Sequence, residues 1–488
     1  MNQSWFLKVS ALLMFVLSAS DGQFQGPQVD RLTGAQIQRD LDSLQSWIRK
    51  IHPSPFVHCS EDEFEAAWIN AAETFVGGGT LFAEAQMVAR VCNALKDSHT
   101  GLALQSFSTQ LGSTYGHLPL EIRTIQNHLI VTNAGTHVEL VGREVTKLNE
   151  VPARSILGSA LPLVSLEGDA QIARLRVAEK LWNDIAPFSV GSRLGDSIQV
   201  SFEDEAPVML PVLNNEQIHA WHNPQPSTTS VEWIWPASAA DTAHVVQLVV
   251  GDFHPENAHS FQRTLRKGFK QVQQLAKDRS VKLVLDLRGN PGGHIAALAE
   301  LLPYLSSEPV RIPYGAQVRV SQAAKDQLVI RNRNLRAKPG HFAHNLKRMD
   351  DVLRSSPIDT LVFVPFEVPI LPNQRIGFSG PVALIMDGLT ASASVSIASW
   401  FIRTGRGATF GEPPMGSISG TFGNPVRMTL PESGLEVTIA SARYFTQNPV
   451  RWESSPLLPN FPINEDIELR FDTRDLQLDA AIRWLREQ

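Results

Sequence analysis

"VKLVLDLRGNPGG", residues 281–293, joins an almost uninterrupted apolar run to a turn rich in glycine. A strand that is apolar at nearly every position is typical of a parallel sheet covered by helices on both faces. A helical pattern follows at residues 294–305, and a second strand–turn–helix pattern, PVALIMDGLTASASVSIASWFIR, spans residues 381–403. This alternation predicts an α/β fold with a parallel sheet, whose binding sites lie at the carboxyl ends of the strands.

The composition of the chain is that of an ordinary globular protein. Of its 488 residues, 43% are hydrophobic and 19% are charged, and the formal net charge is −6. A chain of this length usually forms two or three packed units. It contains no block of basic residues, so we expect no nucleic-acid partner.

The first 20 residues differ from the rest of the chain. One lysine precedes eleven mostly apolar residues, VSALLMFVLSA, and small residues follow. This layout is typical of a secretory signal peptide, and the apolar run is too short to cross a bilayer. We therefore predict a signal peptide at residues 1–20, a periplasmic or extracellular location, and a mature chain without an integral membrane segment. A buried core helix is the alternative.

The pattern of apolar residues divides the remaining chain into three parts and a linker. Thr33 is a possible N-cap near the start of the first part, and Ser60 with Glu63 forms a capping box. Short alternating segments with one helical stretch follow, and then a segment rich in Pro, Ser and Thr. The predicted units are an N-terminal helical domain (21–105), a β-rich module (106–222), a linker (223–230) and an α/β domain (231–488).

The two cysteines, Cys59 and Cys92, are expected to form one disulfide, because exported proteins commonly pair their cysteines. Two buried thiols are the alternative. The cluster of His52, His58 and Cys59 is more typical of a loop than of a metal site, and the chain has no HExxH pattern. We predict no metal and no organic cofactor.

The turn DGLTASAS, residues 387–394, carries several hydroxyl groups at the start of a predicted helix. A serine there can be a simple N-cap, and it acts as a nucleophile only with a base and oxyanion donors nearby. After Ser392 the chain contains no histidine and no lysine, so a base must come from earlier in the sequence. His99, in the polar turn KDSHTGL, is preferred. His294 is the alternative, but it begins a helix, where the dipole disfavours a charged imidazole.

The turn RGNPGG, residues 288–293, can present free backbone amides at the end of a strand, as an oxyanion hole requires. Pro291 fixes one φ angle and lacks an amide, whereas the glycines permit unusual φ angles and close approach of the backbone. A tight strand-to-helix turn without chemistry is the alternative.

In this order and setting, DLRGNPGG (286–293) and TASAS (390–394) resemble the tail-specific, or C-terminal-processing, serine protease superfamily. The resemblance covers roughly residues 30–488. It implies a crotonase-like ββα catalytic core, an N-terminal helical domain with the catalytic histidine, and an inserted PDZ-like module. Ser417 stands where the bacterial tail-specific branch has a catalytic lysine, so the chain is more similar to the tricorn-like branch, whose catalytic groups follow the order His, Ser, Glu.

The pattern of that branch implies a role for individual residues of this chain. The implied catalytic group is the nucleophile Ser392, the base His99, the carboxylate Glu453 and the orienting residue Ser98. The implied oxyanion donors are the backbone amides of Gly292 or Gly293 and of Ala393. Thr390 and Ser394 are expected to be caps or turn formers.

The resemblance implies a secreted serine endopeptidase that hydrolyses peptide bonds through a Ser–His–Glu group, with a peptide or protein as its substrate. Two alternatives share the fold. One is a binding protein that carries a lipid or a peptide, as the interphotoreceptor retinoid-binding protein does, and the other is a hydrolase of non-peptide esters or amides. The chain has no GxSxG pattern, so an α/β-hydrolase esterase is not expected.

Overall fold

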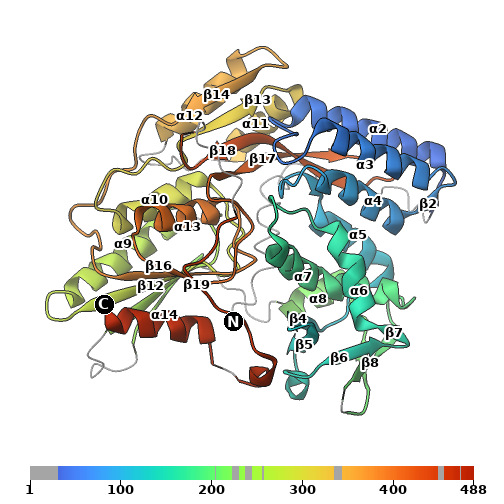
Figure 1. Cartoon of the computed structure of the whole chain (residues 1–488), viewed down its shortest axis with the longest axis horizontal. Helices are drawn as coiled ribbons and strands as arrows, with labels where there is room; N and C mark the ends of the chain where they lie inside the picture. Colours follow the sequence, from blue (N-terminus) through green and yellow to red (C-terminus); the bar gives the residue numbers. More distant parts are fainter. Residues whose placement is uncertain are drawn as a thin grey trace.

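The computed structural model describes residues 31–203, 205–222, 230–236, 244–254, 258–334, 343–448, 456–472 and 474–488. The predicted signal peptide, most of the predicted linker, and Glu453 lie outside these residues. The chain forms a mixed α/β structure, as expected (Figure 1). Within the described ranges, no helix has both the length and the apolar character that a membrane crossing requires.

A six-stranded sheet forms the centre of the α/β part of the molecule. Its strands pair in parallel, except that the edge strand β10 is antiparallel to β11. All six residues of β12 are buried, as predicted from the apolar run. In order across the sheet, the strands are β10 (Val231–Ile234), β11 (His244–Val250), β12 (Val281–Asp286), β15 (Val382–Met386), β16 (Ala408–Gly411) and β19 (Phe461–Pro462).

Helices cover both faces of this sheet (Figure 1). Because side chains alternate along a strand, Val284 packs in the apolar cluster under α14 (Leu476–Glu487), whereas Leu283 and Leu285 face the main core. On the face of the sheet opposite α14 lie α9 (Ala258–Leu275), α10 (Ile295–Leu305) and α13 (Ala393–Thr404). The turns that follow β12 and β15 therefore lie at the same edge of the sheet, each leading into a helix.

A second sheet, which the sequence did not predict, connects the N-terminal helices to the α/β part. Its long hairpin consists of β17 (Gly420–Thr429) and β18 (Glu436–Phe445). Next to β18 comes β13 (Gly315–Arg319), and β14 (Leu361–Pro365) pairs with β13. The two-residue strand β3 (Gly101–Leu102) pairs with β18 beside residues 437 and 438. Helices α11 (Gln322–Asn334) and α12 (Ala343–Ser355) lie next to this sheet (Figure 1).

The N-terminal part is helical, as predicted, with α2 (Gly34–Ile51), α3 (Glu61–Thr74) and α4 (Leu81–Asn93). Thr33 caps α2 and Ser60 caps α3, and both caps are capping boxes in which the third helical residue bonds back to the cap. Short strands β1 (Arg31–Leu32) and β2 (Gly79–Thr80) pair beside them. On α2, Asp40 accepts hydrogen bonds from the amides of Glu432 and Ser433, at the tip of the β17–β18 hairpin.

The middle part contains short strands and helices, but its first segment differs from the prediction. Residues 104–115 form helix α5 (Leu104–Tyr115), because Phe107 and Leu111, four residues apart, bury one helical face. The other elements are β4 (Glu121–Ile125), β5 (His128–Asn133), the 3₁₀ turn η1 (Val138–Leu140), β6 (Val145–Leu148), β7 (Val151–Pro152), α6 (Ala153–Ala160), the 3₁₀ turn η2 (Leu161–Leu163), α7 (Gln171–Ser189), β8 (Ser197–Phe202), β9 (Val208–Pro211) and α8 (Asn215–His222).

A buried network of charges joins the middle part to the α/β part. The guanidinium group of Arg176, on α7, contacts Glu412, which follows β16, at 2.6 Å, and Arg123 on β4 donates to the same carboxylate at 3.0 Å. Burial opposes the charge of Glu412, but the two arginines keep its pKa below the ordinary value. Glu412 also accepts a hydrogen bond of 3.2 Å from the Gly388 amide, so the network reaches the turn that precedes Ser392.

The expected disulfide is wrong, because Cys59 and Cys92 are both free thiols. Cys92 lies on the inner face of α4, where it packs in the apolar core, and burial raises its pKa to about 12. Cys59 lies in the loop before α3 and is only half-buried. The helix face on which Cys92 lies thus gives it the role of a small core residue.

Candidate active site

The two glycine-containing turns are joined by hydrogen bonds at the edge of the central sheet. The hydroxyl group of Thr390 accepts a bond from the Asp387 amide and donates one to the carbonyl oxygen of Leu287, at 3.0 and 2.9 Å. The Ala391 amide donates to the carbonyl oxygen of Asn290 at 2.9 Å. Thr390 is therefore a turn former, as expected, and it ties the loop after β15 to the loop after β12.

Ser392 occupies the N-cap position of α13 but does not act as a cap. Its side chain makes no hydrogen bond to the first turn of the helix, and its φ of 54° lies in a region that residues other than glycine rarely adopt. The Ser392 hydroxyl group is therefore not used by the first turn of α13. The Ser392 Oγ lies 3.3 Å from the Nε2 atom of His99, across 293 residues of sequence.

Ser394 is fully buried, and its hydroxyl group has no hydrogen-bond partner in the described part of the chain. It is therefore neither a cap nor a turn former, in contrast to the expectation. Its position two residues after Ser392, without any contact to His99, makes it a natural control for tests of Ser392.

His99 is held by the loop between α4 and β3. Its backbone amide donates to Asp97 Oδ1 at 2.8 Å, and the other oxygen of Asp97 lies 3.0 Å from Nε2 of His52. The next residue, Thr100, accepts a bond of 3.0 Å from the Ala440 amide of β18. The pairing of β3 with β18 therefore brings His99 to the C-terminal half of the chain.

The pKa of His99 is lowered by burial, which outweighs the opposing charge of Asp97. The imidazole is thus neutral near pH 7 and can accept a proton on Nε2. The alternative base, His294, begins α10 and has its ring 4.8 Å from that of His254. Only His99 is within hydrogen-bond distance of Ser392 among the histidines that the structure describes.

Ser98 and Glu167 continue the chain of polar contacts behind His99. The Ser98 Oγ lies 3.1 Å from His99 Nδ1 and donates to Glu167 Oε2 at 2.8 Å. Glu167 lies between η2 and α7, is 2% exposed, and also accepts bonds from the amides of Ser98 and Phe422 at 3.3 and 3.4 Å. Burial, and next the charge of Asp97, raise the pKa of Glu167 to about 8.

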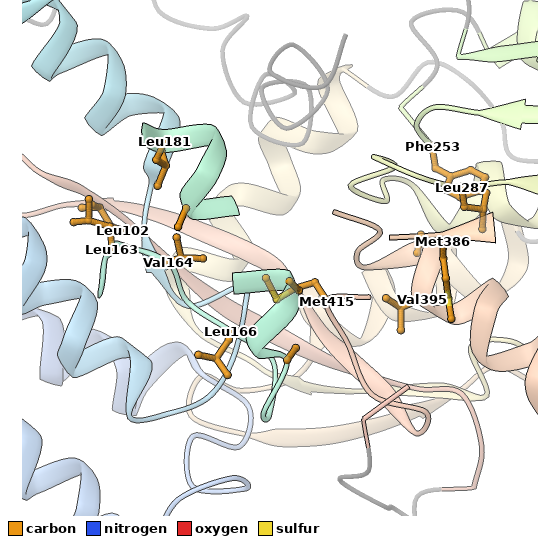
Figure 2. Close-up of a cluster of buried hydrophobic side chains, with 14 of the residues drawn as sticks. Leu102, Leu163, Val164, Leu166, Leu181, Phe253, Leu287, Met386, Val395 and Met415 are labelled. Carbon is orange, nitrogen blue, oxygen red and sulfur yellow. The ribbon is translucent and has the colours of Figure 1, made fainter. Parts of the chain in front are cut away.

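The sequence did not single out Glu167. It lies in the stretch LVSLEGD, residues 163–169, which carries no recognisable pattern. One signal was available: an acidic residue directly follows apolar residues, and in the structure Leu163, Val164 and Leu166 are buried. Figure 2 shows these side chains in the same apolar cluster as Val395 and Met415, which come from the segments around Ser392.

The two glycines of the RGNPGG turn differ in what their amides do. The Gly292 amide donates to the side chain of Asn290 at 2.8 Å, so it is not a free oxyanion donor. The amides of Gly293 and Ala393 donate to no group in the part of the chain that the structure covers. Gly292 instead provides space: a Cβ atom added there would lie 2.6 Å from Ser392 Cβ and 2.8 Å from the Ala393 amide nitrogen.

Asp97, His99 and Glu167 offer ligand atoms that all lie within 4.8 Å of one another, a spacing compatible with a metal ion. The side chains of these three residues already have protein partners, however. Asp97 bonds to His52 and to the His99 amide, and Glu167 accepts from the Ser98 hydroxyl group. The arrangement is thus a hydrogen-bond network, whose donors and acceptors suit proton transfer from Ser392.

Comparisons with known proteins agree with this geometry. The family model of peptidase family S41 matches residues 257–463, which include both turns and Ser392. A crystal structure of a CPAF mutant is similar over 93% of this chain and 98% of that chain, with a TM-score of 0.65 and 11% identity. The structure of mature CPAF complexed with lactacystin is similar over 93% of this chain and 97% of that chain, with a TM-score of 0.60 and 12% identity.

At these identities, the two solved structures show a shared fold and nothing further. A search of curated protein sequences gave no match. The match to the peptidase family includes both turns in the expected order. Residues 257–463 are thus similar to peptidase family S41, and this similarity supports a serine-type peptidase.

Proposed function

We propose that this protein is a secreted serine endopeptidase in which Ser392 attacks the carbonyl carbon of a peptide bond. One observation carries the proposal: Ser392 stands at a helix N-cap with a φ of 54°, makes no cap bond, and has its Oγ 3.3 Å from His99 Nε2. A structural N-cap needs neither the unusual backbone angle nor the histidine. A peptide or protein substrate follows from the peptidase class.

In the proposed reaction, His99 Nε2 accepts the Ser392 proton as Oγ bonds to the carbonyl carbon. The same proton then goes to the leaving nitrogen as the peptide bond breaks, and water later releases the acyl group. The amides of Gly293 and Ala393 are the proposed donors to the oxyanion, aided by the positive end of α13. Loss of one such donor typically lowers the rate about 100-fold to 1,000-fold.

The remaining expectations from the sequence belong to the same proposal. Ser98 is the proposed orienting residue, and Glu453 is kept as the carboxylate that the resemblance implies. The parallel sheet with α9, α10, α13 and α14 supports a crotonase-like core, and the strands β4–β9 support a PDZ-like module at residues 106–222. The division at residues 105, 222 and 230, and export after removal of residues 1–20, are also proposed.

Labelling with a fluorophosphonate, followed by peptide mapping, tests the proposal. The expected result is one adduct, on Ser392, that is lost in Ser392→Ala and falls at least 100-fold in rate in His99→Ala. Ser394→Ala is the matched control, because it removes a buried hydroxyl group two residues away that has no contact with His99. It should label at the rate of the unchanged protein.

An adduct that persists in Ser392→Ala would refute the assignment of the nucleophile. Folded protein that gives no adduct at all would instead favour the non-catalytic binding protein. If the unchanged protein reacts with the probe, an assay with peptide substrates separates the remaining alternatives: an endopeptidase cleaves them, whereas a hydrolase of non-peptide esters does not.

A further inference from the structure

We propose that Glu167, acting through the hydroxyl group of Ser98, is the carboxylate that positions His99 for catalysis. The inference rests on the proposed function, because it assigns a role within the Ser392–His99 pair. Glu167 takes the place behind Ser98 that the resemblance gives to Glu453. The carboxylate is thus supplied by the middle part of the chain, about 70 residues after His99 rather than 60 after Ser392.

The chain of hydrogen bonds leaves Nε2 of His99 without a proton only if Glu167 is ionised. A carboxylate only accepts, so the Ser98 hydroxyl group must donate to it. The oxygen of Ser98 is then free to accept from His99, which requires the proton of the imidazole to be on Nδ1. His99 Nε2 is left without a proton and accepts from Ser392. Four groups in line, with distances of 2.8, 3.1 and 3.3 Å, thereby select the reactive tautomer.

A protonated Glu167 reverses this order. It donates to Ser98, whose hydroxyl group then donates to Nδ1 of His99. The imidazole proton is on Nε2, which can no longer accept the proton of Ser392. The same reversal is expected in Glu167→Gln, because the amide group donates where the carboxylate accepted. The substitution keeps the size of the side chain and changes the direction of the bonds.

Asp97 is the other carboxylate near His99, but its oxygens are engaged elsewhere. Its Oδ1 accepts from the His99 backbone amide and lies 3.8 Å from His99 Nδ1, beyond hydrogen-bond distance. Its Oδ2 lies 3.0 Å from Nε2 of His52. Asp97 therefore holds the loop, whereas the Ser98–Glu167 pair faces the ring nitrogen.

The middle part holds Glu167 firmly in place. The Gly168 amide donates to the carbonyl oxygen of Lys96 at 2.9 Å, next to the His99 loop. On the other side, a Cβ atom at Gly101 would lie 2.1 Å from the Ser165 Oγ, so a side chain there would push the Glu167 segment away from β3. Docking of the middle part is thus a condition for an oriented His99.

The charges around Glu167 set the pH at which it ionises. Asp97 and His99 face it from the loop after α4, and Arg443 faces it from β18 and is influenced by its charge. Lys96 and Asp169 form an exposed ion pair of 3.2 Å nearby. Since the pKa of Glu167 is raised to about 8, activity should rise with pH through this region. Because burial lowers the pKa of His99, the rise in activity that comes from deprotonation of His99 lies at lower pH than this range.

The test is the second-order rate of Ser392 labelling by a fluorophosphonate, measured from pH 6 to about pH 9.5. We expect Glu167→Gln to lose about 100-fold in rate and to lose the rise near pH 8. Ser98→Ala should lose a similar factor. The double variant should lose no more than either single variant, because both changes break the same chain of bonds.

Glu84→Gln is the matched control, since Glu84 is also fully buried and has no contact with Ser98 or His99. It should keep the rate and the pH profile. The labelling rate at each pH is divided by the folded fraction at that pH, which separates positioning from stability. Thermal melting of each variant gives the folded fraction independently.

The inference is overturned if Glu167→Gln labels at full rate with an unchanged profile, or if the losses of the two single variants multiply in the double variant. It is also overturned if Glu453→Gln abolishes labelling while Glu167→Gln does not. In each of these cases Ser392 is still labelled in the unchanged protein, so the proposed function stands. Absence of labelling in the unchanged protein is the distinct result that removes the proposed function.

Discussion

Replacing Gly292 by alanine tests how closely the two turns must approach at the reacting serine. The φ of Gly292 is +94°, and a Cβ atom there would lie 2.6 Å from Ser392 Cβ and 2.7 Å from the carbonyl oxygen of Ala391. Ordinary contacts between carbon atoms are about 3.5–4.0 Å, so the turn around Ser392 must retreat by about 1 Å. A displacement of that size costs about 100-fold in rate.

The unfavourable φ of an alanine adds about 1–2 kcal/mol of destabilisation, whether or not there is a clash. Gly405→Ala separates the two effects. Gly405 ends α13 with a φ of +62°, and a Cβ atom there meets nothing within 4 Å. We expect both variants to lose a comparable amount of stability from the backbone angle, but only Gly292→Ala to lose labelling and peptide cleavage.

The measurements are the second-order rate of fluorophosphonate labelling and the free energy of unfolding in urea. Full labelling of Gly292→Ala would refute the reasoning, because the close approach would then have no part in placing Ser392. An equal loss of labelling in Gly405→Ala would refute it as well, since general strain in α13 would explain both results.

Two further predictions concern buried carboxyl groups away from the reacting atoms. Glu412→Gln removes the carboxylate that Arg123 and Arg176 share but leaves each arginine a second ion pair, with Glu465 and Glu179 respectively. Unfolding in urea should therefore show a loss of about 1–3 kcal/mol, and a loss below about 0.5 kcal/mol contradicts this. Burial and the neighbouring Asp40 raise the pKa of Glu84 to about 9. The folded protein therefore holds a proton that the unfolded chain releases above about pH 4.3, and stability falls as the pH rises towards 9. Glu84→Gln should remove this pH dependence and raise the free energy of unfolding at pH 7 by on the order of 3 kcal/mol. Calorimetry at pH 5 and pH 8 measures this, and an equal change in stability of the two proteins between these pH values contradicts the prediction.

The features that the sequence predicted are those that local patterns determine. An apolar strand, a glycine turn and a following helix each depend on adjacent residues. The parallel sheet, and the placement of both turns at one edge of it, could therefore be predicted from the sequence. The N-caps Thr33 and Ser60 were confirmed for the same reason. The absence of histidine and lysine after Ser392 required a base from earlier in the chain, and His99 was preferred for its polar turn KDSHTGL and for the resemblance. Its contact with Ser392 depends on distant strands.

The features that the sequence did not predict depend on packing between distant segments. Glu167 is a single acidic residue in a loop, and only the docking of the middle part makes it buried and bonded to Ser98. The parity of the cysteines favoured a disulfide, whereas the inner face of α4 makes Cys92 a core residue. Glu453 and the signal peptide stay predictions, because they lie outside the described residues.

The pairing of β3 with β18 has a consequence for the time at which the protein can first react. Thr100, beside the histidine, is bonded to Ala440, which is synthesised 340 residues later. A chain still on the ribosome therefore contains the histidine for most of its synthesis without a fixed place for it, even after the serine has been made. Contacts of such long range also form slowly. The order of synthesis thus delays assembly of the Ser392–His99 pair until β18 has been made.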